Sequence, residues 1–219
     1  MGTEQQGTTI SYGVELVRKA IHLSSISILV FYYFVPRSLT LVVFIPLTLM
    51  FVSIDVARHY HPAVQGWFYL RFGRLLRGHE SDRARKRLNG ATYVLISATL
   101  CVALFPKLVA VISLMIMIFS DLLSALIGRR FGKHRFLGKS IEGTCAFFFS
   151  ALLIVILTPK IDYLFGEYLV GALAALTGAI VEALPWELDD NLTIPLSVGF
   201  SMWAAYALWY PSLDLYKFG

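Results

Sequence analysis

Seven apolar stretches, each close to the length of a membrane-spanning helix, follow one another along this 219-residue chain. A helix needs about 20 predominantly apolar residues to cross the hydrocarbon core of a bilayer. The chain is 57% hydrophobic and only 15% charged, a composition typical of multi-pass membrane proteins rather than of soluble domains. We therefore predict an all-α fold, a multi-pass transmembrane helical bundle.

The stretches predict about seven spans within one integral-membrane domain, residues 1–219. The predicted spans are residues 14–35, 38–57, 89–105, 107–128, 140–158, 165–184 and 192–210. Prolines stand at or beside several of these span ends, where helices tend to stop.

The lysines and arginines predict how the spans are oriented. Cytoplasmic loops of membrane proteins carry an excess of these residues. If the N-terminus lies in the cytoplasm, fifteen of the nineteen lysines and arginines fall on the cytoplasmic side. We therefore expect an integral membrane protein with a cytoplasmic N-terminus.

Residues 58–88 form a basic segment between the second and third predicted spans. Within it, residues 61–77 carry apolar side chains at helical spacing, including Val64, Phe68 and Phe72. This pattern predicts a helix on the cytoplasmic membrane surface. Its arginines would contact either anionic lipid or the phosphates of a substrate.

Polar and ionisable residues gather at the cytoplasmic ends of the predicted spans. Such residues are costly at membrane depth and indicate a functional site. The set comprises Glu15, Arg18, Lys19, His22, Asp55, Asn89, Asp121, Ser124, Gly128, Lys139, Ser140, Glu142, Thr144, Glu182, Glu187, Asp189, Asp190 and Asn191. We therefore expect an active site on the cytoplasmic face.

The stretch 121–144 contains an acid in an apolar run, then a basic, glycine-rich loop, then a second apolar run. Asp121, Ser124 and Gly128 are spaced to share one helix face. Ser140 stands where it can cap the following span, whose first backbone N–H groups favour a phosphate. Carboxylates beside basic residues also suit Mg²⁺, which prefers oxygen ligands and shares them with substrate phosphates. The residues alone thus predict a site for a metal, a phosphorylated ligand and a lipid.

Three sequence blocks follow one another along the chain and face the predicted cytoplasmic side. They read ELVRKAIH at 15–22, DLLSALIGRRFGKHRFLGKSIEGT at 121–144 and VEALPWELDDNLTIPL at 181–196, with a weaker block, LNGATY, at 88–93. Together they resemble the polyprenol kinase family of membrane lipid kinases, which includes dolichol kinases, phytol kinases and CTP-dependent diacylglycerol kinases. The resemblance covers nearly the whole chain, and it departs from many members at Ser120, where they carry glycine.

The resemblance implies a CTP-dependent kinase that transfers the γ-phosphate to the hydroxyl of a long-chain lipid alcohol, giving CDP and a lipid monophosphate. Polyprenols such as dolichol, phytol, geranylgeraniol and diacylglycerol all remain open as acceptors. The implied partners are a lipid alcohol from the bilayer and a nucleotide from the cytoplasm, with Mg²⁺ or another divalent cation as cofactor and without nucleic acid.

The residues and the resemblance together give an expected role to each member of the site. Catalytic roles are expected for Asp121, Glu142 and Lys139. Metal ligands are expected at Asp121, Glu142, Glu182, Asp189 and Asp190. Nucleotide or phosphate binding is expected of Arg18, Lys19, Gly128, Gly132, Lys133, Gly138, Ser140, Gly143 and Asn191. Further candidates are His22, Asp55, Asn89 and Ser124.

Several of these residues also have a purely structural interpretation. Asp121 would pair with a buried basic residue, and Glu142 would stabilise a helix start. Ser140 and Asn89 would cap helices, and Asp55 would pair with Arg58. His22 would form a buried hydrogen bond. Lys139, Asp189 and Asp190 would be surface charges.

Two other activities compete with the kinase. One is a cytidylyltransferase that acts on a lipid phosphate and releases pyrophosphate. The other is a membrane transporter, which typically places its charges near the bilayer midplane. Here the charges lie at one face, so the pattern favours the kinase.

Overall fold

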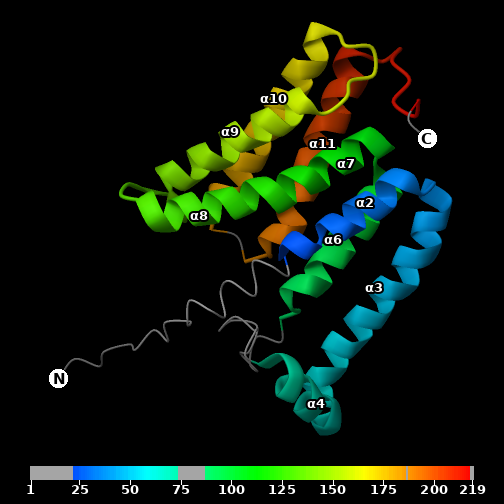
Figure 1. Ribbon diagram of the computed structural model, residues 1–219, viewed down its shortest axis with the longest axis vertical. Helices are drawn as coiled ribbons and strands as arrows, with labels where there is room; N and C mark the ends of the chain where they lie inside the picture. Colours follow the sequence, from blue (N-terminus) through cyan, green and yellow to red (C-terminus); the bar gives the residue numbers. More distant parts are fainter. Residues whose placement is uncertain (1–21, 74–86, 186, 218–219) are drawn as a thin grey trace.

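The computed structural model describes residues 22–73, 87–185 and 187–217, and these residues are predominantly helical (Figure 1). The helices are α2 (Ile26–Phe34), α3 (Arg37–Tyr60), α4 (Pro62–Phe72), α6 (Gly90–Leu104), α7 (Lys107–Met115), the π-helix η2 (Ile116–Ser120), α8 (Asp121–Phe131), α9 (Ile141–Leu157), α10 (Phe165–Ala183) and α11 (Asp190–Trp209). Two short strands, β1 (Arg135–Phe136) and β2 (Lys139–Ser140), form an antiparallel hairpin. The predicted all-α class is confirmed, and the hairpin is an addition to it.

Within the described residues, four helices are long and apolar enough to cross a membrane: Arg37–Tyr60, Lys107–Phe131, Phe165–Ala183 and Asp190–Trp209. The second of these is continuous through α7, η2 and α8. Three shorter apolar helices, His22–Phe34, Gly90–Leu104 and Ile141–Leu157, lie where the other predicted spans were placed. The number of about seven spans is therefore not confirmed, although the apolar helices are consistent with an integral membrane protein.

Small residues bring the helices of the core close together. The helix α10 packs against both α9 and α11, and α8 packs against α9 (Figure 1). A Cβ atom on Gly171 of α10 would lie 2.2 Å from Cγ1 of Val155 on α9, so these two helices approach more closely than a larger side chain allows. Ala175 and Ala179 are also buried, so the small residues of α10 form a packing surface.

The connection between α9 and α10 is held by buried charges. Glu167 is fully buried and accepts hydrogen bonds from the backbone N–H groups of Ile161 (2.7 Å), Asp162 (3.0 Å) and Leu164 (3.0 Å). Lys160, also buried, donates to the carbonyl of Thr158 (2.6 Å). Both charges thus satisfy backbone groups of a loop, and we interpret them as structural. No sequence pattern singled out Glu167.

The basic segment after α3 begins with α4, which confirms the start of the helix expected over residues 61–77; its part from residue 74 onward lies outside the described residues. Phe68 is buried beneath the guanidinium of Arg58, 4.8 Å from the ring centroid. Trp67 and Leu70 are exposed, as expected of a helix that meets a membrane surface.

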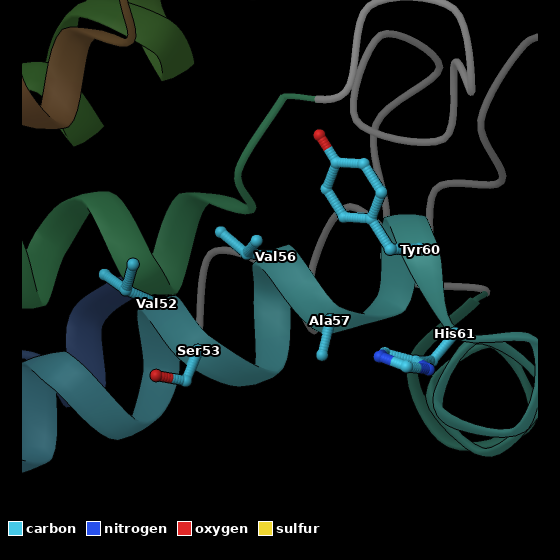
Figure 2. A pocket seen from close by; sticks show the side chains of 6 residues that line it. All are labelled: Val52, Ser53, Val56, Ala57, Tyr60 and His61. Atoms are coloured by element: carbon cyan, nitrogen blue, oxygen red, sulfur yellow. The ribbon is translucent and has the colours of Figure 1, made fainter.

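A groove of about 600 Å³ lies where α3 approaches α4 (Figure 2). Its lining is Val52, Ser53, Val56, Ala57, Tyr60 and His61. The polar side chains of Tyr60 and His61 stand at its α4 end, and the α3 part is mainly apolar (Figure 2). None of these six residues belongs to the predicted site.

Candidate functional site

The β1–β2 hairpin is fixed against the end of α10. Arg135 pairs with Ser140, and Phe136 pairs with Lys139. Leu137 turns the chain with a φ of 51°, in the left-handed region that non-glycine residues seldom adopt. The backbone N–H of Gly138 then donates to the carbonyl of Ala183 (2.9 Å). Because of this bond, the next residue, Lys139, lies beside the last turn of α10.

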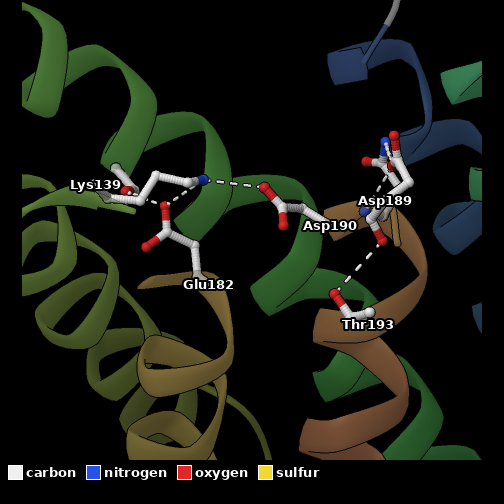
Figure 3. A network of polar contacts seen from close by, with 7 residues as sticks. Lys139, Glu182, Asp189, Asp190 and Thr193 are labelled. Carbon is white, nitrogen blue, oxygen red and sulfur yellow. Dashed lines mark hydrogen bonds and ion pairs between the residues drawn. The ribbon is translucent and has the colours of Figure 1, made fainter. Parts of the chain in front are cut away.

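Lys139 joins two carboxylates from different helices (Figure 3). Its Nζ donates to Oε1 of Glu182 on α10 (3.0 Å) and to Oδ2 of Asp190 on α11 (3.0 Å). The same Oε1 of Glu182 accepts a hydrogen bond from Oγ of Ser124 on α8 (2.8 Å). We call Ser124, Lys139, Glu182 and Asp190 the lysine cluster. It joins three helices to the hairpin at one end of the bundle, which we call the hairpin end.

The lysine cluster is partly open to solvent. The side chain of Glu182 is 1% exposed, whereas those of Lys139 and Asp190 are 36% and 31% exposed. Burial acts to lower the pKa of Lys139, but the charges of Asp190, Glu182 and Asp121 outweigh it and raise that pKa above its usual value. Lys139 is therefore a stable cation at neutral pH, reachable by a ligand, and its charge keeps neighbouring carboxylates together.

Asp121 is the first residue of α8 and lies close enough to Lys139 for their charges to interact. The helix face predicted to contain Asp121, Ser124 and Gly128 is observed. Ser124 is buried in the lysine cluster, and the Cα of Gly128 lies so near α9 that a Cβ there would be 3.1 Å from Oγ of Ser140. Asp121, at the same helical spacing, therefore belongs to the face that α8 turns toward the lysine cluster, and its catalytic role there stays a prediction.

One buried acceptor of the cluster has no donor within the described part of the chain. Oε2 of Glu182 is buried and accepts no hydrogen bond from residues 22–73, 87–185 or 187–217. A carboxylate oxygen in this state is costly unless a ligand or cation satisfies it. A donor or a metal ion beside this oxygen would satisfy it.

Glu142 faces the loop that precedes α9. It accepts hydrogen bonds from the backbone N–H groups of Lys133 (3.1 Å) and His134 (3.3 Å), and it pairs with Nδ1 of His134 (2.8 Å). These bonds hold the basic loop against the start of α9. The expected catalytic or metal-binding role of Glu142 stays a prediction, and so does the phosphate-binding role of Lys133.

Several structural interpretations are confirmed. Ser140 caps α9 by accepting from the N–H of Gly143 (3.2 Å), and Asn89 caps α6 by accepting from that of Thr92 (3.1 Å). Asp55 forms a buried ion pair with Arg58 and also accepts from the N–H of Asn89 (2.6 Å). Asp189, which the sequence suggested as a surface charge, instead caps α11 by accepting from the backbone and the side chain of Asn191 (3.0 and 2.7 Å). A further role of these residues in ligand binding stays a prediction.

The glycines of the predicted phosphate site lie in tight places. A Cβ on Gly132 would lie 2.1 Å from the carbonyl oxygen of Gly128, and one on Gly143 would lie 3.1 Å from that of Ser124. A Cβ on Gly138 would lie 3.3 Å from Pro185. Packing alone therefore explains these three glycines.

Sequence reasoning did not find the π-helix η2, which ends directly before Asp121. Ile118 within it accepts a hydrogen bond at its carbonyl oxygen from Nε2 of His22 (3.2 Å). The hydrogen bond expected of His22 is thus confirmed, with a partner that no sequence pattern indicated, but the side chain is only partly buried. Arg18 and Lys19 lie outside the described residues.

The described residues contain no group of three or more His, Cys, Asp and Glu side chains placed to hold a metal ion. Lys139 instead lies between Glu182 and Asp190. The donors nevertheless fit Mg²⁺ in kind, because they are carboxylate oxygens and one of them, Oε2 of Glu182, has no described partner. Such a site would take its remaining ligands from substrate phosphates and water.

Apolar helices of membrane-spanning length and a charged cluster at one end of the bundle are consistent with a helical membrane protein that has a polar cluster at its helix ends. The chain is 33% identical, over 192 residues, to an uncharacterized protein of Rickettsia prowazekii, covering 86% of this chain and 93% of that protein. It belongs to the same family as that protein.

The chain is also 34% identical, over 109 residues, to a phytol kinase of a Synechocystis species. This match covers 46% of each protein, so it relates the chain to the phytol kinase in part only. No protein-family model and no solved structure matches the chain.

Proposed function

We propose that this protein is a lipid-alcohol kinase, which transfers the γ-phosphate of a nucleotide to the hydroxyl of a long-chain alcohol. The observation that carries the proposal is the partial match to a phytol kinase, a protein named for phosphorylating such an alcohol. The resemblance of the three sequence blocks to polyprenol kinases favours CTP as the donor. Those blocks include the residues that form the lysine cluster.

The lysine cluster supports phosphate binding. Lys139 is a partly exposed cation with a raised pKa, so it can exchange its carboxylate partners for the oxygens of a phosphate. Phosphoryl transfer depends mainly on positioning and on the neutralisation of charge. Glu182 and Asp190 would hold Mg²⁺, which would neutralise phosphate charge when bound there.

Asp121 would accept the proton of the alcohol. It begins α8 at the hairpin end, next to the cation of Lys139, and it belongs to an apolar helix of membrane-spanning length. In the proposed arrangement of about seven spans with a cytoplasmic hairpin end, the alcohol reaches this site from the bilayer and the nucleotide arrives from the cytoplasm. General-base assistance of this kind typically contributes 10²–10⁴-fold in rate.

The proposal is tested with purified protein in lipid vesicles, CTP, ATP or UTP labelled in the γ-phosphate, and a panel of phytol, geranylgeraniol, polyprenol and diacylglycerol. Transfer of label to one of these alcohols is expected, with CTP as the best donor. Asp121→Asn should lower the rate at least about 100-fold. Asp214→Asn, which changes an acid near the C-terminus, is the matched control and should retain activity.

The nucleotide product separates the kinase from a cytidylyltransferase. A kinase releases the nucleoside diphosphate and needs a lipid alcohol, whereas cytidylyl transfer releases pyrophosphate and needs a lipid phosphate. Absence of label in every alcohol, with the protein folded and inserted, would refute the kinase. Vesicle uptake of a solute without any transfer would favour the transporter instead.

A further inference from the structure

A π-helical turn interrupts the long apolar helix directly before Asp121. The segment η2 spans Ile116–Ser120, between α7 and α8. A π turn contains one residue more than the corresponding α turn, and such turns are frequent at functional sites. One residue more or less rotates the following part of a helix by about 100°. The direction of Asp121 relative to α7 therefore depends on this turn.

The π turn is held by a residue from the first part of the chain. Nε2 of His22 donates to the carbonyl oxygen of Ile118, the central residue of η2, at 3.2 Å. His22 begins the apolar helix His22–Phe34, which packs against α7. Side chains that bond to backbone groups of a helix are a recognised cause of local departures from α geometry. His22 is thus placed to stabilise the widened turn.

The widened turn is also in contact with the helices that build the site. Both α9 and α11 pack against η2, and Asp121 follows it at once. On the far side of Asp121, Ser124 is fixed by its hydrogen bond to Glu182. Asp121 therefore lies between two anchored points, the bond from His22 to Ile118 and the bond from Ser124 to Glu182.

We propose that His22 is a positioning residue, which holds the π turn through the Ile118 carbonyl and so directs Asp121 toward the lysine cluster. This geometric role does not depend on the reaction, whereas its effect on the rate rests on the proposed kinase activity. Direct binding of phosphate by His22 would give a different kinetic result.

The first test reads the position of residue 121 without any substrate. Asp121→Cys is made in a Cys145→Ser background, where the remaining thiol, Cys101, is buried. The rate of alkylation by N-ethylmaleimide is then compared with and without His22→Ala. We expect His22→Ala to change the alkylation rate at least about fivefold, which corresponds to the loss of one ordinary hydrogen bond. His22→Gln should keep the alkylation rate within about twofold.

The matched control for this test is His59→Ala. Nε2 of His59 also lies 3.2 Å from a backbone carbonyl, that of Arg87, but far along the chain from η2. We expect this variant to leave the alkylation rate at residue 121 unchanged. An alkylation rate that His22→Ala does not alter, or that His59→Ala alters equally, would overturn the proposal.

The second test uses the kinetics of the otherwise unmodified enzyme. A positioning role predicts that His22→Ala lowers kcat, leaves the KM of the nucleotide within about twofold, and is rescued by His22→Gln. Direct phosphate binding would instead raise the KM of the nucleotide, and that result would contradict the proposal. If the wild-type protein shows no kinase activity, the proposed function fails, but the alkylation test still decides the role of His22.

Discussion

Asp189 and Asp190 are neighbours in the chain, but their carboxylates have different partners. Asp190 accepts from Nζ of Lys139 (Figure 3). Asp189 accepts from the backbone and the side chain of Asn191 at the start of α11. The first bond joins α11 to the hairpin, and the second lies within one helix turn. Removing the charge of Asp190 is therefore expected to have a different effect from removing the charge of Asp189.

We predict that Asp190→Asn lowers the kinase rate at least about tenfold, because it removes a charge-assisted bond to Lys139 and a candidate metal ligand. Asp189→Asn should have a much smaller effect, since asparagine caps a helix about as well as aspartate. Initial rates of the two variants, with thermal unfolding as a check of folding, measure the difference. Equal losses would indicate that both acids bind the substrate or the metal.

Local sequence patterns predicted the contacts of some of these residues. They did not predict contacts between residues far apart in the chain. Ser140 and Asn89 are helix caps, whose partners lie three residues away, so the sequence contains the whole interaction. The bonds from Lys139 to Glu182 and Asp190 join residues 43 and 51 positions apart. The sequence indicated that these residues share one face, but the pairing follows from how the hairpin rests on α10.

The hairpin and the loop before it form the element that places Lys139. The chain leaves α8 through Gly132, whose N–H bonds to the carbonyl of Gly128 (3.1 Å), and it reaches Ala183 through Gly138. No apolar periodicity marks so short a pair of strands, which is why the sequence predicted only a basic, glycine-rich loop. The long helices were predictable because apolar stretches and prolines define their extent, whereas nothing in the sequence 116–120 revealed η2.

We predict that Gly132→Ala disrupts this element. A Cβ there would lie 2.1 Å from the carbonyl oxygen of Gly128 and 2.8 Å from Oγ of Ser140, so the loop must move and carry Lys139 with it. We expect a loss of stability above about 1 kcal/mol and a large loss of kinase activity. Thermal unfolding and initial rates measure both.

Gly66→Ala is the matched control, because a Cβ on Gly66 in α4 has no neighbour within 4 Å. Alanine in a helix interior should be neutral or slightly stabilising there. If Gly132→Ala behaves like Gly66→Ala in both measurements, the close approach at Gly132 does not position the hairpin.

At the scale of the whole molecule, the charged side chains at the two ends of the bundle differ in their partners and in their exposure. At the α9–α10 connection, Glu167 and Lys160 are bonded to backbone groups of one loop. At the hairpin end, Oε2 of Glu182 has no partner within the described residues, and Lys139 is partly exposed. These two features of the hairpin end support the proposal that a ligand binds there. The sequence predicted that acids gather at the hairpin end, but it predicted neither the buried Glu167 at the other end nor how many helices reach the length of a span.

The basic residues of the chain predict how the bundle is oriented in the membrane. Fifteen of the nineteen lysines and arginines lie on the side predicted to be cytoplasmic, which is the side of the hairpin. Leu188, between α10 and α11 at the hairpin end, and Phe165, the first residue of α10 at the other end, are 55% and 77% exposed. Each is changed to cysteine in a Cys145→Ser background and treated with a membrane-impermeant maleimide.

In intact cells the thiol introduced by Phe165→Cys should react, because the α9–α10 connection is expected outside. The thiol introduced by Leu188→Cys should react only after the membrane is permeabilised. If both thiols react after permeabilisation, each is accessible to the maleimide. A difference between them in intact cells is then caused by the membrane barrier. The reverse pattern would place the lysine cluster on the outer face, where cytoplasmic CTP cannot reach it, and would contradict both the orientation and the nucleotide-dependent kinase.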